Sequence, residues 1–270
     1  MKIVSENLKR LVDWFSPYRG AVVSFSGGVD SSLVAYAAKK ALGNKALAVS
    51  FLNPIFTEEK VERTRKVAED IGIEVTFENL QLPKLFYRNP VNRCYVCKET
   101  MARILVLVKR KIGADVAVDS YHKGDLHDFM PGRAAMVRYG IRSPLYELGF
   151  GRREVKAMLR HLGFSWADVP SMPCLATRIP FGQKITEEKL HRIANAERIV
   201  KEITGAQVVR VRDHRNLARI EVDRAERSLF FDEDLMDRVH KELSALGYSF
   251  ISLDLYGYKR GSVSRPARLS

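Results

Sequence analysis

The stretch Ala21-Val-Val-Ser-Phe-Ser26-Gly27-Gly28-Val29-Asp30-Ser31-Ser32 decides the fold of this chain. It begins with a short apolar run, which predicts a buried strand over residues 21–25, and the apolar periodicity that follows predicts a helix over residues 31–42. The two glycines between them allow a tight turn and a close approach of the backbone to an anion. The free N–H groups and the positive dipole end of the helix favour an anion at the same place.

The side chains of this turn suit a chain of phosphates. Serine hydroxyls add donors, and the Asp30 carboxylate can hold a Mg²⁺ ion that bridges phosphate oxygens. The Gly-Lys-Ser/Thr of the common NTPase loop is missing, so a different phosphate loop is indicated. A glycine turn that only joins a strand to a helix is the alternative, but the complete string favours nucleotide binding. The predicted binding residues are Ser24, Ser26, Gly27, Gly28, Val29, Asp30, Ser31 and Ser32.

The string resembles the PP-loop of the ATP pyrophosphatases, the N-type adenine nucleotide α-hydrolases. The resemblance implies that these residues bind ATP and pyrophosphate, with Mg²⁺ on Asp30. It also implies that the enzyme attaches AMP to an oxygen of its substrate and releases pyrophosphate.

Length and composition limit the classes of protein to which this chain can belong. The 270 residues suit one large domain or two moderate ones, and a hydrophobic content of 46% can build a full core. The net charge of +13 fits either a nucleic acid or small anionic ligands, and the mixing of bases with acids favours a soluble basic enzyme. No apolar run approaches the roughly 20 residues of a membrane span. The charged N-terminal residues do not resemble a signal peptide, so we expect a cytoplasmic protein with no membrane partner.

Predicted strands and helices alternate along the first part of the chain. This order predicts an α/β fold, a doubly wound parallel sheet covered by helices on both faces, with the phosphate turn at the carboxyl ends of the strands. We expect strands at residues 21–25, 45–51, 74–78 and 115–119, and helices at residues 7–15, 31–42, 58–71, 98–112 and 152–162.

Two prolines in the run Val169-Pro170-Ser171-Met172-Pro173-Cys174 interrupt regular structure, so we place a hinge there. Beyond it, helices at residues 186–204 and 233–246 and strands at 207–212, 217–222 and 250–256 indicate a smaller C-terminal α+β domain with an antiparallel sheet. The expected parts are a nucleotide-binding domain at 1–168, a hinge with the Cys174 loop at 169–185, and a domain for substrate binding or oligomerisation at 186–270.

The chain has three cysteines, and an odd, low count argues against a disulfide framework. Cys94 and Cys97 form a CxxC that we expect in a loop opening a helix. A redox pair, a zinc site completed by Cys174 and by His122, His127 or a water, a three-cysteine iron–sulfur cluster, and unrelated thiols all stay open.

Cys174 lies in a proline-flanked irregular segment, which is not typical of a core cysteine. The neighbouring cation Arg178 favours a thiolate. These two features favour a chemical role for Cys174 over a purely structural one.

Three segments together resemble the LarE family: the PP-loop, Asn89-Pro-x-x-Arg93-Cys94-x-x-Cys97-Lys98, and Pro173-Cys174-Leu-Ala-Thr-Arg178-Ile-Pro-x-Gly182. The resemblance covers nearly the whole chain. LarE proteins are sulfur transferases for the nickel-pincer nucleotide cofactor of lactate racemase and related enzymes. The resemblance implies that ATP adenylates a carboxylate of pyridinium-3,5-biscarboxylic acid mononucleotide and that a sulfur donor then displaces AMP. Two rounds give the bisthiocarboxylate.

The family has two sulfur sources. Some members sacrifice the sulfur of one cysteine at the position of Cys174, and others carry three cysteines and are thought to use a [4Fe–4S] cluster that passes on an extra sulfide. The resemblance therefore implies a cluster held by Cys94, Cys97 and Cys174, which act as catalytic residues with Asp30. It also implies a sulfide donor and a homo-oligomer, as a hexamer.

One segment departs from the family pattern. The family often shows Asp-Gly-Thr-Asn where this chain reads Asp119-Ser120-Tyr121-His122, whereas Asp128-x-x-Pro131-Gly132-Arg133 agrees better. Because His122, His127 and Asp128 follow the fourth predicted strand, we expect them near the ligand. Asp128 suits either a metal ion or a loop salt bridge.

We expect arginines to bind the phosphate of the substrate, since a guanidinium can donate two parallel hydrogen bonds to phosphate. Candidates are Arg178, Arg210 and Arg212, and the last two share one face of a strand. Their alternative is a solvated face. Glu197 and Glu221 are further substrate-site candidates, although helix and strand surfaces carry such acids routinely.

Rival functions stay open beside a LarE-type sulfurtransferase. A PP-loop tRNA thiolase shares adenylation and a three-cysteine cluster, and its tRNA complex would be sensitive to salt. An amidotransferase-fed ligase, such as an NAD or GMP synthetase, gives no role to Cys94 and Cys97. A nucleotide-sensing module would bind ATP without releasing pyrophosphate.

Overall fold

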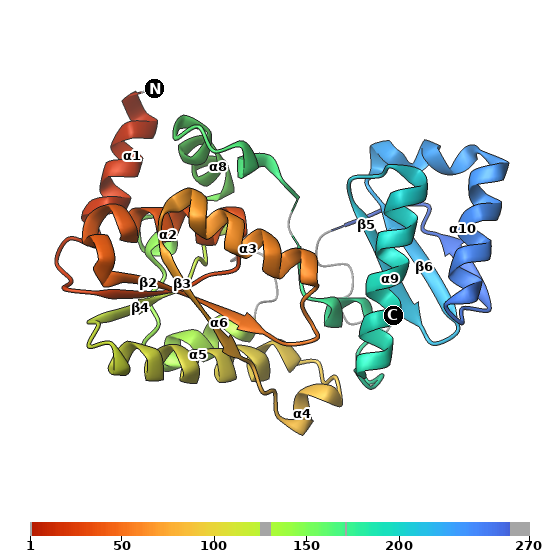
Figure 1. The fold of residues 1–270 in the computed structure, drawn as a ribbon, viewed down its shortest axis with the longest axis horizontal. Coiled ribbons are helices and arrows are strands. Elements are labelled where there is room, and N and C mark those ends of the chain that lie inside the picture. The colour runs from red at the N-terminus through yellow and green to blue at the C-terminus, as the bar shows by residue number, and fades with distance from the viewer. Residues whose placement is uncertain (1, 125–130, 171, 260–270) are drawn as a thin grey trace, which may run out of the picture. The chain divides into compact units, whose positions relative to one another are not determined.

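The computed structural model describes residues 2–124, 131–170 and 172–259 (Figure 1). The chain divides into two compact units, unit 1 with Met1–Pro83 and Asn92–Met172, and unit 2 with Lys84–Val91 and Pro173–Ser270. The break after Met172 falls in the proline-rich run. The segment Lys84–Val91, which the sequence placed in the nucleotide-binding domain, belongs to unit 2 because its hydrogen bonds are made there.

Unit 1 is built on a sheet of parallel strands in the order β3 (Glu74–Asn79), β2 (Ala46–Leu52), β1 (Ala21–Ser24) and β4 (Val116–Val118). The predicted doubly wound sheet is confirmed. Because β2 and β4 pair with opposite edges of β1, the strand order reverses at β1. The carboxyl ends of β1 and β4 are therefore the place where such a sheet binds ligands.

Helices cover both faces of this sheet (Figure 1). One core contains Leu11, Leu33, Val67 and Leu159, which come from the helices of one face. These helices are α1 (Lys2–Asp13), α2 (Val29–Leu42), α3 (Glu58–Ile71) and α8 (Arg152–His161). The other face carries α5 (Arg93–Lys111) and α6 (Pro131–Arg138), and the short α7 (Pro144–Glu147) follows α6 in sequence.

Local signals explain where α3 begins and ends. The Thr57 side chain accepts a hydrogen bond from the Lys60 N–H at 3.2 Å, and two glutamates occupy the first turn. Gly72 closes the helix in the left-handed conformation with φ 73°. Both ends are as the sequence predicts.

The start of α5 differs from the prediction. Cys94 and Cys97 lie inside the first turns of the helix and not in a loop before it. The Asn92 carbonyl accepts from the N–H groups of Tyr95 and Val96 at 2.8 and 3.3 Å, so the helix begins right after Asn92. Pro90 is the last residue that opposes a helix here.

Unit 2 contains the sheet β5 (Val209–His214), β6 (Leu217–Val222) and β7 (Phe250–Leu253). β5 and β6 are antiparallel, but β6 and β7 are parallel, so the expected antiparallel sheet is in fact mixed. The reason is the crossover through η5 (Arg224–Phe231) and α10 (Glu233–Ala245), which returns the chain to the start of β6.

The core of unit 2 joins this sheet to its helices. It includes Val200 of α9 (Glu187–Thr204), Val211, Ile220 and Leu243. Unit 2 also holds α4 (Lys84–Tyr87) and the 3-10 turn η4 (Leu175–Arg178). Among the described residues of the chain, the helices are all too short or too polar to cross a membrane.

The α3 cap gives the first prediction. Thr57→Ala should lower the free energy of unfolding by about 1 kcal/mol, because the Lys60 N–H loses its side-chain acceptor. Urea unfolding followed by circular dichroism measures this change. Thr57→Ser keeps the hydroxyl and should unfold like the parent; an equal loss in both variants would contradict the role of the cap.

Candidate functional site

The turn after β1 has a backbone that only glycine fits. Gly27 has φ 64°, and a Cβ added there would come within 2.8 Å of the Thr64 Cα on α3. Gly28 is the N-cap residue of α2, with extended backbone and no side-chain cap. The free N–H groups of the helix start are therefore available to an anion.

Serine hydroxyls hold this turn in shape. Ser31 and Ser32 both donate to the Gly28 carbonyl, at 3.0 and 2.8 Å, and both are buried. The Ser26 N–H donates to the Ser31 hydroxyl at 3.2 Å, while Ser26 itself is exposed. All the predicted phosphate-binding residues thus lie between the end of β1 and the first turn of α2.

The segment after β4 reaches this turn. His122 is buried, and its Nε2 lies 3.9 Å from the Asp30 Oδ2. The Asp30 side chain is 29% exposed and so remains accessible to a metal ion or ligand. The structure brings His122 and Asp30 together as the topology predicts, whereas His127 and Asp128 lie outside the described residues.

Asp119 is a site residue that the sequence analysis treated only as part of a departing motif. It directly follows β4 and is 4% exposed. Its Oδ1 accepts from the Ser143 hydroxyl at 2.6 Å and from the Tyr121 N–H at 3.2 Å, while its Oδ2 is buried without a hydrogen-bond partner among the described residues. A carboxylate directly after a buried strand at the switch point is the signal that could have found it.

Burial raises the pKa of Asp119 to about 6, against the opposing effects of its two hydrogen bonds and of Lys98 and Arg133. Lys98 lies on α5 and Arg133 on α6. These helices pack closely, since a Cβ on Gly132 would lie 2.7 Å from the Lys98 Cγ. The Arg133 guanidinium lies over the Tyr146 ring at 3.8 Å. Cations therefore surround this end of β4 together with the buried acid.

None of Cys94, Cys97 and Cys174 is in a disulfide bond. Cys94 is exposed, Cys97 is partly buried, and they are three residues apart on α5. Cys174 is partly buried and comes just before η4; its carbonyl accepts from the Thr177 N–H and hydroxyl and from Arg178. Within residues 2–124, 131–170 and 172–259, no cluster of three metal-ligating side chains is found.

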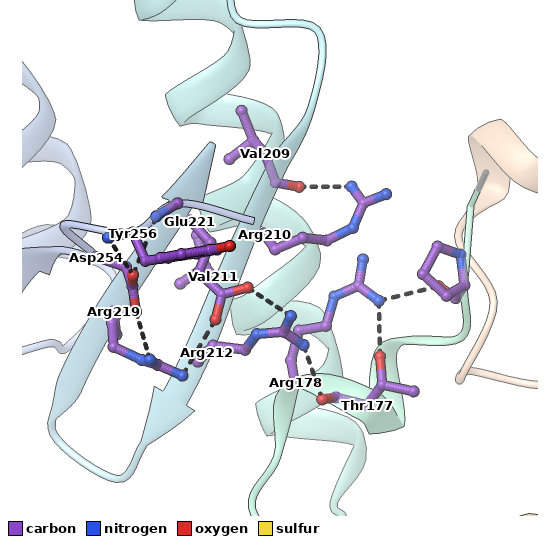
Figure 2. A network of polar contacts seen from close by, with 12 residues as sticks. Thr177, Arg178, Val209, Arg210, Val211, Arg212, Arg219, Glu221, Asp254 and Tyr256 are labelled. Atoms are coloured by element: carbon purple, nitrogen blue, oxygen red, sulfur yellow. Dashed lines mark hydrogen bonds and ion pairs between the residues drawn. The ribbon is translucent and has the colours of Figure 1, made fainter. Parts of the chain in front are cut away.

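The predicted substrate residues form one polar network in unit 2 (Figure 2). Arg178 is 2% exposed and donates to both carboxylate oxygens of Glu197, at 2.7 and 2.9 Å. Arg212 donates to Glu221 at 2.6 Å and to the Thr177 carbonyl at 3.0 Å. The network thus reaches the segment that follows Cys174.

Arg210 and Arg212 are buried, so a solvated face is not the explanation for them. Arg210 donates to the Val209 carbonyl at 2.6 Å. Sequence reasoning missed Arg219, which pairs with Glu221 at 3.1 Å and with Asp254 at 2.6 Å. Its position on β6, opposite Arg212, is the signal that could have found it.

Electrostatics make this network attractive to an anion. Burial tends to lower the pKa of Arg178, but the Glu197 carboxylate raises it overall. Burial and the nearby charge of Arg178 lower the pKa of Arg210. Two buried guanidinium groups that repel one another are stabilised when a phosphate binds between or beside them.

The chain is similar to several known proteins. A model of the NAD synthase family matches residues 3–102. An uncharacterized protein of Synechocystis, slr1717, is 35% identical over 97% of this chain and 98% of its own length. Pyridinium-3,5-bisthiocarboxylic acid mononucleotide synthase of Lactiplantibacillus plantarum is 31% identical over 90% of this chain and 88% of its own. A glutamine-hydrolyzing GMP synthase of Aeropyrum pernix is 28% identical, but only over 67% of this chain and 39% of its own.

The phosphate turn gives a second prediction. Gly27→Ala should abolish ATP binding, measured by calorimetry, because its Cβ collides with Thr64. The control is Gly72→Ala, at another left-handed glycine with open space around it. This control should cost about 1–2 kcal/mol of stability and leave ATP binding unchanged. Equal ATP affinity in both variants would contradict the close contact.

The buried acid gives a third prediction. Folded Asp119 has a pKa of about 6 against an ordinary 3.8, so its proton stabilises the folded state fully below about pH 4. That contribution, on the order of 3 kcal/mol, is lost as the pH rises through 6. The free energy of unfolding of Asp119→Asn relative to that of the parent, measured in urea, should therefore be higher at pH 7.5 than at pH 4.5.

The matched control is Asp115→Asn. A hydrogen bond from the Arg19 side chain lowers the pKa of Asp115, so this carboxyl stays ionised in both the folded and the unfolded state from pH 4.5 to 7.5, and the stability of the control relative to the parent should not change over this range. A stability difference between Asp119→Asn and the parent that does not change with pH would show that the acid is not buried as described.

Proposed function

The chain belongs to the pyridinium-3,5-bisthiocarboxylic acid mononucleotide synthase (LarE) family and is an ATP-dependent sulfurtransferase, and we propose that its substrate is pyridinium-3,5-biscarboxylic acid mononucleotide. In this proposal it converts a carboxylate of that nucleotide to a thiocarboxylate on the way to the nickel-pincer cofactor. The carrying observation is the similarity to the synthase over 90% of the chain, which includes both units. The NAD synthase model and the GMP synthase relative match smaller parts of the chain, residues 3–102 and 67% of the chain.

The first step activates a carboxylate, which is a poor electrophile because oxide is a poor leaving group. A carboxylate oxygen attacks the α-phosphorus of ATP, the bond to the bridging oxygen breaks, and pyrophosphate leaves. The N–H groups at the start of α2 and the exposed Ser26 hydroxyl are suited to the pyrophosphate. The partly exposed Asp30 carboxylate supplies the hard oxygen that Mg²⁺ prefers, and that ion would neutralise the departing charge.

The second step forms the carbon–sulfur bond. A sulfur nucleophile attacks the carbonyl carbon of the acyl-adenylate, the carbon–oxygen bond to AMP breaks, and AMP carries away the electron pair. No electron is gained or lost overall. A second round on the other carboxylate gives the bisthiocarboxylate.

We propose that Cys94, Cys97 and Cys174 hold a [4Fe–4S] cluster. The residue types fit, because all three are thiols outside disulfide bonds with some exposure, and two are spaced one helical turn apart near a helix start that favours negative charge. Three protein thiolates leave one iron to carry an extra sulfide, which is the chemistry that the cluster would supply. Zinc on the CxxC with Cys174 as a sacrificial donor is the alternative.

The phosphate of the substrate is proposed to bind at Arg178, Arg210 and Arg212. All three are buried, and Glu197 fixes Arg178 by two hydrogen bonds while Glu221 fixes Arg212 by one. Because Arg178 also donates to the Cys174 carbonyl, a phosphate held there lies within the same unit as Cys174.

The organisation around this chemistry is also proposed. Residues 169–185 serve as a hinge with the Cys174 loop, and residues 186–270 bind substrate and form a homo-oligomer, as a hexamer. A sulfide donor reloads the enzyme in the cytoplasm.

Two variants separate the two steps and give the fourth prediction. With ATP and the biscarboxylate, Asp30→Asn should release pyrophosphate at least about 100-fold more slowly, because Mg²⁺ loses its ligand. Cys174→Ala should still release pyrophosphate but form no thiocarboxylate, which mass spectrometry detects as replacement of oxygen by sulfur. Glu202→Gln, in an exposed ion pair on α9, should behave like the parent.

Anaerobic purification followed by iron and acid-labile sulfide analysis tests the cluster. About four irons per chain with matching sulfide would support it. Absence of iron after reconstitution would contradict it and leave Cys174 as the sacrificial donor. A thiolated tRNA product in place of a thiocarboxylate would contradict the substrate and favour the tRNA thiolase.

A further inference from the structure

Asp30 and His122 belong to different segments of unit 1 but meet at the carboxyl edge of its sheet. Asp30 lies in the first turn of α2, and His122 lies in the segment that follows β4. The His122 Nε2 is 3.9 Å from the Asp30 Oδ2, which is longer than the about 2.7–3.2 Å of a direct hydrogen bond. The distance does suit two ligands of one metal ion, because atoms that each lie about 2.1 Å from the ion are at most about 4.2 Å apart.

The packing of the His122 ring leaves its Nε2 toward Asp30. The side chain is 3% exposed. A Cβ added to Gly124 would lie 3.1 Å from the ring Cε1 and 3.2 Å from the ring Nδ1, so this edge of the ring packs closely against the backbone. In this orientation the Nε2 can bind an ion while the Nδ1 keeps the ring proton.

Hydrogen bonds hold the chain on both sides of His122. Before it, the buried Asp119 Oδ1 accepts from the Tyr121 N–H at 3.2 Å. After it, the Lys123 N–H donates to the Phe150 carbonyl at 3.0 Å. The imidazole is therefore presented by a fixed segment, as a metal ligand has to be if the site is to form without a large loss of freedom.

An ion can reach this pair from the phosphate turn. The Asp30 side chain is 29% exposed, and it belongs to the turn whose N–H groups are proposed to bind the phosphates of ATP. Within the part of the chain that the structure describes, no group of three metal-ligating side chains is found. The remaining ligands of an ion held by Asp30 and His122 would therefore come from phosphate oxygens and from water.

The donor atoms of the pair indicate the kind of metal. Mg²⁺ prefers oxygen ligands in a near-ideal octahedral arrangement. An imidazole nitrogen instead suits divalent transition metals such as Zn²⁺, Fe²⁺ and Co²⁺, which also accept carboxylate and phosphate oxygens. A site with one imidazole nitrogen and one carboxylate oxygen therefore gains more from a transition metal than from Mg²⁺.

We propose that Asp30 and His122 together bind the divalent ion that accompanies ATP, and that His122 makes this site favour a transition metal over Mg²⁺. The inference rests on the proposed function, which brings the phosphates of ATP to the same turn. Asp30 stays the oxygen ligand assigned above, and His122 adds a second protein ligand from the segment after β4. A histidine that only pairs with the Asp30 carboxylate would give the site no such preference.

The test uses Co²⁺ as the probe, together with the α,β-methylene analogue of ATP, which lacks the bond that the first step breaks. Thiolates also bind transition metals, so every protein carries Cys94→Ser, Cys97→Ser and Cys174→Ser. In this background His122→Asn removes the imidazole. The matched control is His161→Asn, which removes an exposed imidazole on α8 of the same unit.

The first measurement is proton NMR of the Co²⁺ complex and requires no turnover. Co²⁺ is paramagnetic and moves the exchangeable Nδ1 proton of a ligating imidazole far outside the ordinary spectrum. This resonance should appear in the background protein and in His161→Asn, and it should be absent from His122→Asn. Circular dichroism checks that each variant is folded, and His122→Gln takes the place of a His122→Asn protein that is not.

The second measurement is calorimetry of Co²⁺ and of Mg²⁺ binding to the protein with the analogue bound. His122→Asn should weaken Co²⁺ binding roughly tenfold, since loss of even a supporting group of a metal site costs this much. Mg²⁺ binding should stay within about twofold of the background protein, because the oxygen ligands that Mg²⁺ prefers remain. His161→Asn should leave the affinity for both ions unchanged.

Absence of the shifted resonance from the background protein would overturn the inference, and so would a resonance that persists in His122→Asn. An equal loss of Co²⁺ and Mg²⁺ affinity in His122→Asn would also overturn it, because His122 would then set no preference. Failure of the analogue to bind with either ion would overturn the proposed adenylation as well. Binding of the analogue without the resonance overturns the role of His122 alone.

Discussion

The contact between the turn at Gly27 and helix α3 is the constraint on which the rest of the site depends. No Cβ fits between Gly27 and Thr64, so the backbone must turn there in the left-handed conformation. That turn ends β1 and starts α2, which directs the free N–H groups and Asp30 to the carboxyl edge of the sheet. Since β1 lies between β2 and β4, the same edge also receives Asp119 and His122.

In the proposed function, the two units bind phosphate groups by different physical means. Unit 1 relies on backbone N–H groups and a helix dipole, which bind phosphate without carrying a full charge. Unit 2 buries guanidinium groups and fixes two of them against Glu197 and Glu221. Burial and the nearby charge of Arg178 still lower the pKa of Arg210, so a bound phosphate would stabilise its charged form. Such a division suits the two phosphate-bearing substrates proposed above, ATP and pyridinium-3,5-biscarboxylic acid mononucleotide.

The proposed sulfur chemistry involves cysteines from both units. Cys94 and Cys97 lie in the first turns of α5 in unit 1, whereas Cys174 precedes η4 in unit 2. Arg178 links the buried arginines to the Cys174 segment, because it pairs with Glu197 and donates to the Cys174 carbonyl. The segment that follows Cys174 and the proposed phosphate site are therefore joined by hydrogen bonds, such as the one from Arg212 to the Thr177 carbonyl (Figure 2).

The amino-acid sequence by itself determined the features that depend on neighbouring residues: the phosphate turn, the cap at Thr57, the left-handed end at Gly72 and the parallel β–α order of unit 1. Tertiary structure decided the rest. Asp119 is marked by burial that no local pattern reports, β7 runs parallel to β6 because a whole crossover intervenes, and Asn89 binds carbonyls some ninety residues away. Local signals reflect backbone preferences within a few residues, whereas burial, strand direction and long-range hydrogen bonds exist only once distant segments have packed together.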